Sequence, residues 1–136
     1  RGLGDVYKRQ EVLDTLKELQ VPMTICSASI KDNIDFFISS FQLDRWFDVE
    51  NIIYDDGTHV DKISMFHDGA AAIGVKLEDC MIIEDSLSGL DFAYRCQPGR
   101  LIAITTPERK AAYEKIAGVD AVIHDFHNFD TSFFLE

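Results

Sequence analysis

Apolar residues along the chain switch repeatedly between a helical period and short continuous runs. Residues 11–20 carry apolar side chains at helical spacing, and Pro22 then interrupts the chain before the apolar run Met23–Cys26. The first pattern predicts a helix and the second a buried strand. Both patterns recur to the end of the chain. The further predicted helices are 34–41, 62–74, 87–94 and 107–116, and the further predicted strands are 51–54, 80–83, 101–104 and 121–123.

The predicted strands are apolar on both faces, which is typical of a parallel sheet covered by helices on each side. Strands and helices alternate without a long linker, an internal repeat or a low-complexity stretch, and this order is the signature of βαβ units. With 136 residues there is room for one compact domain. We therefore expect an α/β fold, namely a Rossmann-like doubly wound parallel sheet.

Charge and composition narrow the class of protein. The formal net charge is −11 and the pI is about 4.6, so nucleic acids and anionic membrane surfaces are not expected partners. The apolar runs are too short to span a membrane and no signal peptide is evident, which favours a cytoplasmic protein. The three cysteines have no CxxC spacing, and we interpret them as reduced thiols of the core rather than as a disulfide or zinc site.

The first ten residues, RGLGDVYKRQ, differ from the rest of the chain. They contain no initiator Met and no apolar periodicity, and residues 5–10 are the translation of GATGTGTATAAGAGACAG, which resembles a transposon-based sequencing adapter. We therefore expect residues 1–10 to be a non-native tail and residues 11–136 to be the native segment. The alternative is a natural basic tail that happens to spell the adapter.

The candidate functional residues follow the carboxyl ends of predicted strands, where ligands bind in open α/β sheets. Ser27-Ala28-Ser29 is predicted as a small turn opening a helix, whose hydroxyls and backbone N–H groups could receive an anion. The pair Glu84-Asp85 follows another strand, where two carboxylates are costly unless a cation offsets them. Lys62 opens the helix between these strands. A hydroxyl, a cation and paired carboxylates together suggest a site for phosphate and Mg²⁺.

These segments resemble the haloacid dehalogenase-like (HAD) hydrolase superfamily, and within it the phosphatase and β-phosphoglucomutase-like branch. The stretch EVLDTLKELQVPMTICSAS is similar to the helix and strand of the second family motif, with Ser27 at the motif position. The stretch MIIEDSLSGLDFAYRC is similar to the fourth motif, whose acidic pair holds Mg²⁺; Glu84 and Asp85 take those positions. Lys62 falls at the place of the third-motif lysine, although Ile63-Ser64-Met65 stands where relatives carry Pro-x-Pro.

The resemblance implies a mechanism whose first part is missing from this chain. In the family, an Asp-x-Asp motif at the end of a central strand supplies the aspartyl nucleophile, and no such motif follows a strand here. The cap domain is absent as well, so residues 11–136 correspond to the C-terminal part of a catalytic core. The intact parent would transfer a phosphoryl group of a small phosphorylated metabolite through an aspartyl-phosphate with Mg²⁺. We expect this chain alone to be inactive.

The missing strand also has a structural consequence. In the family it lies between the strand that ends at Ser27 and the strand that ends at Glu84. Without it, those two strands either keep unpaired edges or close up on each other. We expect marginal stability or aggregation of the isolated chain.

Simpler interpretations remain for each feature. Asp85 or Ser86 can act as a helix N-cap, Ser27 can belong to a capped turn, and Lys62 can be an ordinary solvated residue. The four histidines are expected on the surface or in loops rather than at a metal, and residues 133–135 are expected to dock on the core.

The alternative function is a non-catalytic α/β binding module. A receiver domain would carry its acidic residues earlier in the chain, and a dinucleotide-binding domain would carry G-x-G-x-x-G after a strand.

Overall fold

Helices and strands alternate along the whole described chain. The structure is a computed structural model and describes residues 3–127 and 129–135. The helices are α1 (Leu3–Glu18), α2 (Lys31–Phe41), α3 (Lys62–Ile73), α4 (Leu87–Arg95) and α5 (Lys110–Glu114). The strands are β1 (Cys26–Ile30), β2 (Ile53–Asp55), β3 (Met81–Glu84), β4 (Arg100–Ile104) and β5 (Ala121–Ile123). Short 3₁₀ turns cover Leu43–Arg45, Val49–Asn51, Leu77–Asp79, Pro107–Arg109 and Ser132–Leu135.

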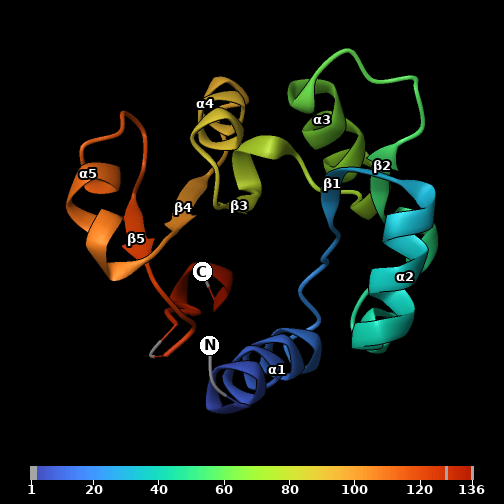
Figure 1. Cartoon of the computed structure of the whole chain (residues 1–136), viewed down its shortest axis with the longest axis horizontal. Helices are drawn as coiled ribbons and strands as arrows, with labels where there is room; N and C mark the ends of the chain where they lie inside the picture. The colour runs from blue at the N-terminus through green and yellow to red at the C-terminus, as the bar shows by residue number, and fades with distance from the viewer. Residues whose placement is uncertain (1–2, 128, 136) are drawn as a thin grey trace.

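The strands form two separate parallel sheets. One sheet has the order β1-β2, and the other has the order β3-β4-β5. The β3–β4 pairing is regular over four residue pairs, whereas the β1–β2 register is irregular between Cys26 and Ile30. Figure 1 shows β1 and β3 nearest each other across a gap, with β2 and β5 outermost. The α/β class with parallel strands is therefore confirmed, and the sheet is divided into two parts.

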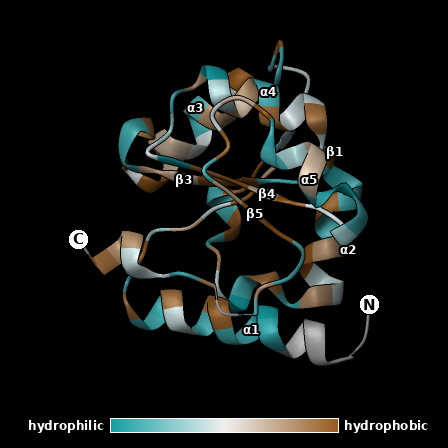
Figure 2. Cartoon of the chain, turned by 90° about the vertical axis from the view of Figure 1, so that its left-hand side faces the viewer, coloured by the Kyte–Doolittle hydropathy of each residue, from teal (hydrophilic) through white to brown (hydrophobic). Residues whose placement is uncertain are grey.

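The elements lie in three layers. Figure 2 shows the strands as an apolar middle layer, with α3 and α4 on one side and α1 on the other. The best-enclosed side chains belong to α4 and β4, where Leu90 and Ala103 are fully buried and Leu101 is almost so. The core is therefore centred on the three-stranded sheet. No helix of the described residues is long and apolar enough to cross a membrane.

Helix α3 connects the two sheets because it follows β2 and precedes β3. It packs against both β1 and α4. At Gly69 a Cβ atom would come within 2.6 Å of the Sγ atom of Cys26, so the absence of a side chain allows α3 to approach β1. The helix begins after Asp61, whose carboxylate accepts a hydrogen bond from the Ser64 N–H at 3.1 Å, and ends at Gly74 with a φ of 70°.

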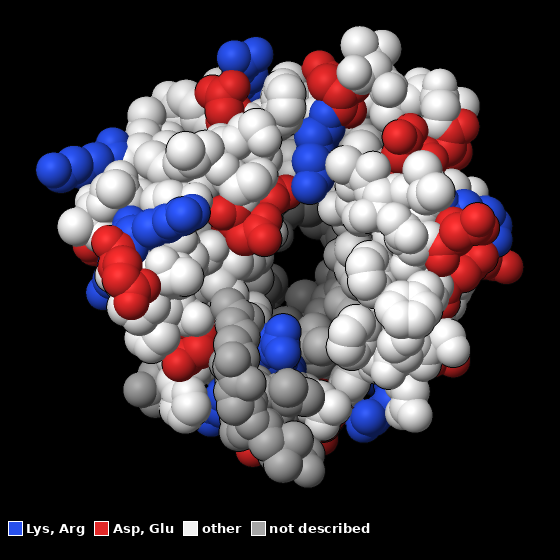
Figure 3. Space-filling view, in the orientation of Figure 1, with Lys and Arg blue, Asp and Glu red and all other residues white. Residues whose placement is uncertain are grey.

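A cleft lies between the two sheets. Its volume is about 400 Å³, and its walls include the segment Met23–Cys26 on one side and β3 on the other. Helix α1 and the aromatic rings of Phe129 and Phe134 also line it. Figure 3 shows the hollow in the middle of the molecule, with acidic and basic side chains together on its rim.

Of the two outcomes expected for the missing strand, the described residues show the unpaired edges. Phe134 contacts the cleft as expected of a docking segment, whereas Leu135 is exposed.

The first strand lies later in the chain than predicted. The apolar run Met23–Cys26 predicts the strand, but only Cys26 of that run belongs to β1, which continues to Ile30. Backbone pairing explains the difference, since β2 pairs Ile53 with Cys26 and Asp55 with Ile30. The predicted turn at residues 27–29 is therefore wrong, because these residues are strand.

Apart from the start of α1, which lies eight residues earlier than predicted, the other boundaries agree with the predictions to within a few residues. Gly57 lies in the predicted turn after β2 with a φ of 84°. The three cysteines are free; Cys96 is buried as expected of a core thiol, whereas Cys26 and Cys80 are only partly buried. Helix α1 begins at Leu3 and runs through residue 10 without a break, so the helix does not mark the boundary of the expected non-native tail. Residues 1–2 lie outside the described residues, and the origin of the tail stays a prediction.

Candidate functional site

A buried ion pair joins the start of α3 to the end of β3. The Nζ atom of Lys62 lies 2.8 Å from Oε2 of Glu84, and the Glu84 side chain is 7% exposed. A carboxylate in such a place needs a partner, because removal of its hydration costs several kcal/mol. The Lys62 ammonium provides this partner, and the backbone N–H of Asp85 donates to the other carboxylate oxygen at 3.2 Å. Two of the predicted site residues are thus in direct contact.

The first turn of α4 shapes the pocket around Glu84. A Cβ atom at Gly89 would come within 2.5 Å of the Glu84 carboxyl group, so a glycine is needed for the carboxylate to lie against this helix. The Ser86 hydroxyl caps α4 by accepting a hydrogen bond from the Gly89 N–H at 3.0 Å. The helix N-terminus beside Glu84 favours negative charge there. Ser86, and not the Asp85 carboxylate, therefore forms the cap.

Asp85 combines a fixed backbone with an exposed side chain. The Tyr113 hydroxyl of α5 donates a hydrogen bond to the Asp85 carbonyl oxygen at 3.2 Å. Tyr113 is itself buried, so this contact holds the loop after β3 against the core. The carboxylate of Asp85 is left accessible to a ligand from solvent. Sequence reasoning missed Tyr113, because no local pattern connects residues 28 positions apart.

Ser27 and Ala28 lie in a different environment from the one predicted. They belong to β1, and α2 begins only at Lys31. The Ser27 hydroxyl accepts a hydrogen bond from the Ser29 N–H at 3.2 Å, whereas Ala28 is exposed. The predicted anion site at a helix N-terminus is therefore wrong in its local structure. A phosphate-binding role for Ser27 and Ala28 stays a prediction.

The thiol of Cys26 connects β1 electrostatically to the ion pair. Burial raises the pKa of Cys26 to about 11, while the nearby positive charge of Lys62 opposes this shift and the negative charge of Glu84 adds to it. The Sγ atom also donates to the Met65 carbonyl oxygen of α3 at 3.4 Å. The start of β1 therefore shares the environment of Lys62 and Glu84 at the cleft.

The donor atoms suit a hard cation better than a soft one. Glu84 and Asp85 provide carboxylate oxygens, and Mg²⁺ is commonly bound by one or two carboxylates together with water and phosphate oxygens. Among the described residues no group of three His, Cys, Asp or Glu side chains is arranged to hold a metal ion. The residues present fit Mg²⁺ whose remaining ligands come from solvent and substrate.

One histidine departs from its predicted place. The side chain of His59 is only 8% exposed, and its two ring nitrogens lie 2.7 Å from Asp68 and 3.3 Å from Asp56. The expectation of surface or loop histidines is correct in that His59 follows the turn after β2, but its ring is enclosed by these two carboxylates. This cluster connects the loop between β2 and α3, which carries Asp56 and His59, to Asp68 within α3.

Comparisons with known proteins give a consistent result. Residues 7–96 match the family described as haloacid dehalogenase-like hydrolase, and the matched range contains Lys62, Glu84 and Asp85. No curated protein matches the chain. Among solved structures, a HAD hydrolase of family IA, variant 3, from Entamoeba histolytica HM-1:IMSS is similar with a TM-score of 0.85 and 26% identity.

Two further solved structures share the fold at lower identity. A HAD family hydrolase from Deinococcus radiodurans R1, with bound phosphate and sodium, has a TM-score of 0.78 and 20% identity. A putative β-phosphoglucomutase from Thermotoga maritima has a TM-score of 0.69 and 18% identity. The three alignments cover 92%, 92% and 84% of this chain but only 56%, 57% and 53% of those proteins. The chain thus spans about half the length of the structures that it resembles.

Proposed function

The chain belongs to the haloacid dehalogenase-like hydrolases, and we propose from this premise that it forms the magnesium- and phosphate-binding part of a phosphoryl-transfer enzyme. The observation that carries this proposal is the buried Lys62–Glu84 ion pair with the exposed Asp85 carboxylate beside it. An ammonium group and carboxylates at the carboxyl end of a parallel strand provide for an anionic substrate and its cation together.

Each residue has a distinct proposed role. Lys62 binds a phosphoryl oxygen, and its contact with Glu84 orients the ammonium group. Asp85 and Glu84 would hold Mg²⁺, which when bound neutralises negative charge on the transferring phosphoryl group. Ser27 and Ala28 are proposed to bind phosphoryl oxygens through the Ser27 hydroxyl and the backbone N–H of Ala28. Tyr113 is a positioning residue, since it contacts only the Asp85 backbone among these groups.

The proposed substrates are small phosphorylated metabolites such as sugar phosphates, handled by a phosphatase or a phosphomutase. The intact parent would use an aspartyl nucleophile, as the family resemblance implies, and the sequence contains no Asp-x-Asp after a strand. We therefore propose that these 136 residues bind the cation and phosphate without turnover. The net charge of −11 favours a protein that does not bind nucleic acids, and the free cysteines favour a cytoplasmic one.

Ligand binding tests this proposal without requiring activity. Isothermal titration of the chain with MgCl₂ in the presence of inorganic phosphate should show binding. Asp85→Asn should weaken it by about tenfold or more, since a neutral amide replaces a charged ligand. Asp44→Asn is the matched control, because Asp44 is an exposed acid on a 3₁₀ turn away from the site. Equal binding by Asp85→Asn and the control would contradict the proposed site and favour a binding module of another kind.

Turnover provides a second measurement. The chain should not hydrolyse p-nitrophenyl phosphate with Mg²⁺ above the rate of buffer alone. Hydrolysis that Asp85→Ala abolishes would contradict the proposed inactivity, because the active nucleophile would then have to lie within these 136 residues.

A further inference from the structure

We propose that His59 is a positioning residue for Lys62, because its ring joins the loop after β2 to α3 and this loop leads directly into Lys62. The effect of the contact on the start of α3 follows from the geometry alone. Its effect on anion binding rests on the proposed function, in which Lys62 binds a phosphoryl oxygen.

His59 is the one enclosed side chain of its loop. Residues 55–58 are exposed, and Val60 is 95% exposed. The ring of His59, by contrast, is only 8% exposed. Figure 1 shows this loop as a wide arc between β2 and α3. A loop without buried apolar side chains has little to hold it against the core, so the His59 ring is its main point of attachment.

The first contact of the ring is with α3. The Nε2 atom of His59 lies 2.7 Å from Oδ2 of Asp68. An ionised carboxylate only accepts hydrogen bonds, so this ring nitrogen carries the proton and donates it. Asp68 belongs to the second turn of α3, which begins at Lys62. The loop therefore folds back along the first two turns of the helix and is held there.

The second ring nitrogen faces the loop itself. The Nδ1 atom of His59 is buried without a hydrogen-bond partner among the described residues, and Oδ1 of Asp56 lies 3.3 Å away. Hydrogen bonds from the hydroxyl and the N–H of Thr58 lower the pKa of the Asp56 carboxyl, which keeps it ionised. A proton on Nδ1 provides a donor beside this oxygen and places a cationic ring between two carboxylates.

Lys62 is sensitive to the loop because it is the first residue of α3. Helix ends fray unless other contacts hold them. The cap of this helix is the Asp61 carboxylate, which accepts the Ser64 N–H, and Asp61 itself follows the loop. The contact of His59 with Asp68 restrains the loop and the second helical turn together. It thereby fixes the backbone from which Lys62 reaches Glu84 at 2.8 Å.

One substitution separates positioning from charge by its sign. Asp68 is an exposed carboxylate on the same helix as Lys62. On electrostatic grounds alone, removal of its negative charge should strengthen the binding of an anion. If Asp68 holds His59, and through it the start of α3, Asp68→Ala should weaken anion binding instead.

Sulfate is the probe, because it is a tetrahedral dianion that the chain cannot hydrolyse. Isothermal titration with sodium sulfate in the presence of MgCl₂ measures its affinity. His59→Ala and Asp68→Ala should each weaken binding by about fivefold, the equivalent of one hydrogen bond. The double variant should bind no more weakly than either single variant, because the two side chains act through one contact.

Two further variants serve as rescue and control. His59→Gln keeps an amide donor that can reach Asp68, so it should recover most of the affinity that His59→Ala loses. His67→Gln removes an exposed histidine of the same helix and should bind sulfate like wild type.

Hydrogen exchange followed by NMR tests the same contact without an anion. In His59→Ala the amides of Ser64 and Phe66 in the first turns of α3 should exchange about fivefold faster than in wild type. The amides of β4 should exchange at the wild-type rate, which verifies that the rest of the fold is intact.

Other outcomes would overturn the proposal. Sulfate binding that His59→Ala leaves unchanged, or that Asp68→Ala strengthens, would show that the cluster does not position Lys62. Faster exchange throughout the chain in His59→Ala would show that the ring supports the whole fold rather than the start of α3. If wild type does not bind sulfate while Ser64 and Phe66 exchange faster in His59→Ala, the proposed function fails and the positioning role of His59 stands.

Discussion

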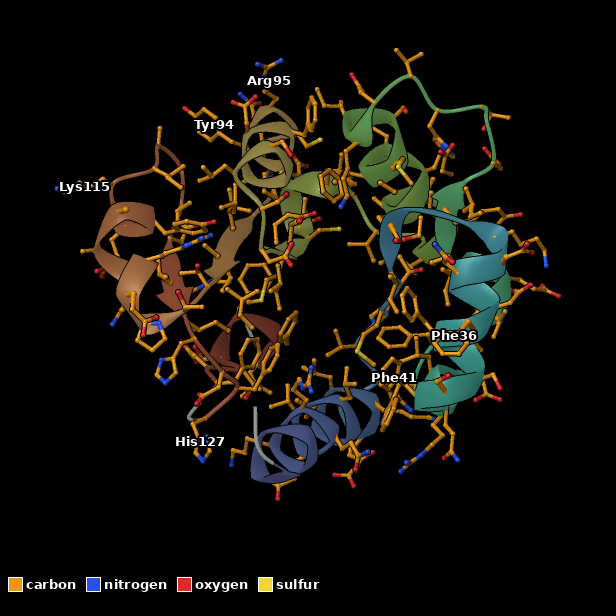
Figure 4. All side chains as sticks on the ribbon, in the orientation of Figure 1. Phe36, Phe41, Tyr94, Arg95, Lys115 and His127 are labelled. Atoms are coloured by element: carbon orange, nitrogen blue, oxygen red, sulfur yellow. The ribbon has the colours of Figure 1, made fainter. Side chains whose placement is uncertain are left out.

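The two sheets of this protein differ in how completely they bury their side chains. The three-stranded sheet has a regular register and encloses Leu90 and Ala103 completely. In the two-stranded part, β1 and β2 pair irregularly, and Ile34 is the one side chain of α2 that is buried. Figure 4 shows Phe41 on the side of α2 nearest α1, and this ring is 61% exposed. The three-stranded part therefore has its own core, whereas the two-stranded part depends on neighbours.

The cleft explains why the two parts differ. A dry cavity of about 400 Å³ would cost on the order of 10 kcal/mol at ~24 cal/mol per Å³. That cost is comparable to the whole stability of a typical domain. In a stable chain, either water or protein atoms must therefore occupy the cleft. Where water occupies it, side chains of β1 and α1 lose packing contacts. We therefore expect marginal stability of the isolated chain.

Truncation of one core residue in each part is the most direct test of whether the two parts differ in how well their cores are packed. Leu90→Ala should lower the free energy of unfolding by about 4 kcal/mol and Ile34→Ala by about 2, because the space left by Leu90 is fully enclosed. Urea unfolding followed by circular dichroism measures both. Leu87→Ala, at an exposed position of α4, is the control and should leave the free energy unchanged. Equal losses for Leu90→Ala and Ile34→Ala would contradict the difference between the two parts.

The Lys62–Glu84 pair tests the connection between the parts, because Lys62 lies on α3 and Glu84 on β3. Lys62→Met should lower the free energy of unfolding by about 3 kcal/mol, since the buried carboxylate loses its partner. The double variant Lys62→Met/Glu84→Gln should recover most of this loss, because it carries no unpaired charge. Lys31→Met removes an exposed pair with Asp35 and should have no measurable effect in the same urea titration. No recovery in the double variant would show that the lysine stabilises the fold through the cation–π contact of its ammonium group with the Phe66 ring instead.

The sequence predicts this fold well where one pattern decides an element. The apolar period of residues 62–74 and the terminal glycine predict α3 closely, and the apolar run at 121–123 coincides with β5. The prediction from sequence fails at residues 23–30, where the apolar run and the paired strand do not coincide. Strand bounds there depend on the register with β2, which is a long-range property. A single sequence window does not contain that information.

The candidate site, too, could be predicted from the sequence only where local patterns determine it. The strand-to-helix position of Glu84 and Asp85 and the helix start at Lys62 are local, and their approximate neighbourhood follows from parallel topology alone. The contact of Lys62 with Glu84, the packing of Gly89 on the carboxylate and the hydrogen bond from Tyr113 depend on side-chain packing between elements. The misplaced turn at Ser27 follows directly from the misplaced strand.

The pH dependence of stability gives the smallest and most local test, because it concerns one thiol at the cleft. Burial raises the pKa of Cys26 from 9.0 to about 11, so the unfolded thiol ionises at a lower pH than the folded one. The free energy of unfolding should therefore be constant below pH 9 and should fall by about 2 kcal/mol between pH 9 and 11. The measurement is urea unfolding from pH 8 to 11, with Cys26→Ala as the comparison. Other groups titrate in both proteins, so the difference between the two curves reports Cys26 alone. A difference that does not change with pH would show that the thiol is hydrated and that the cleft is open to water at this end.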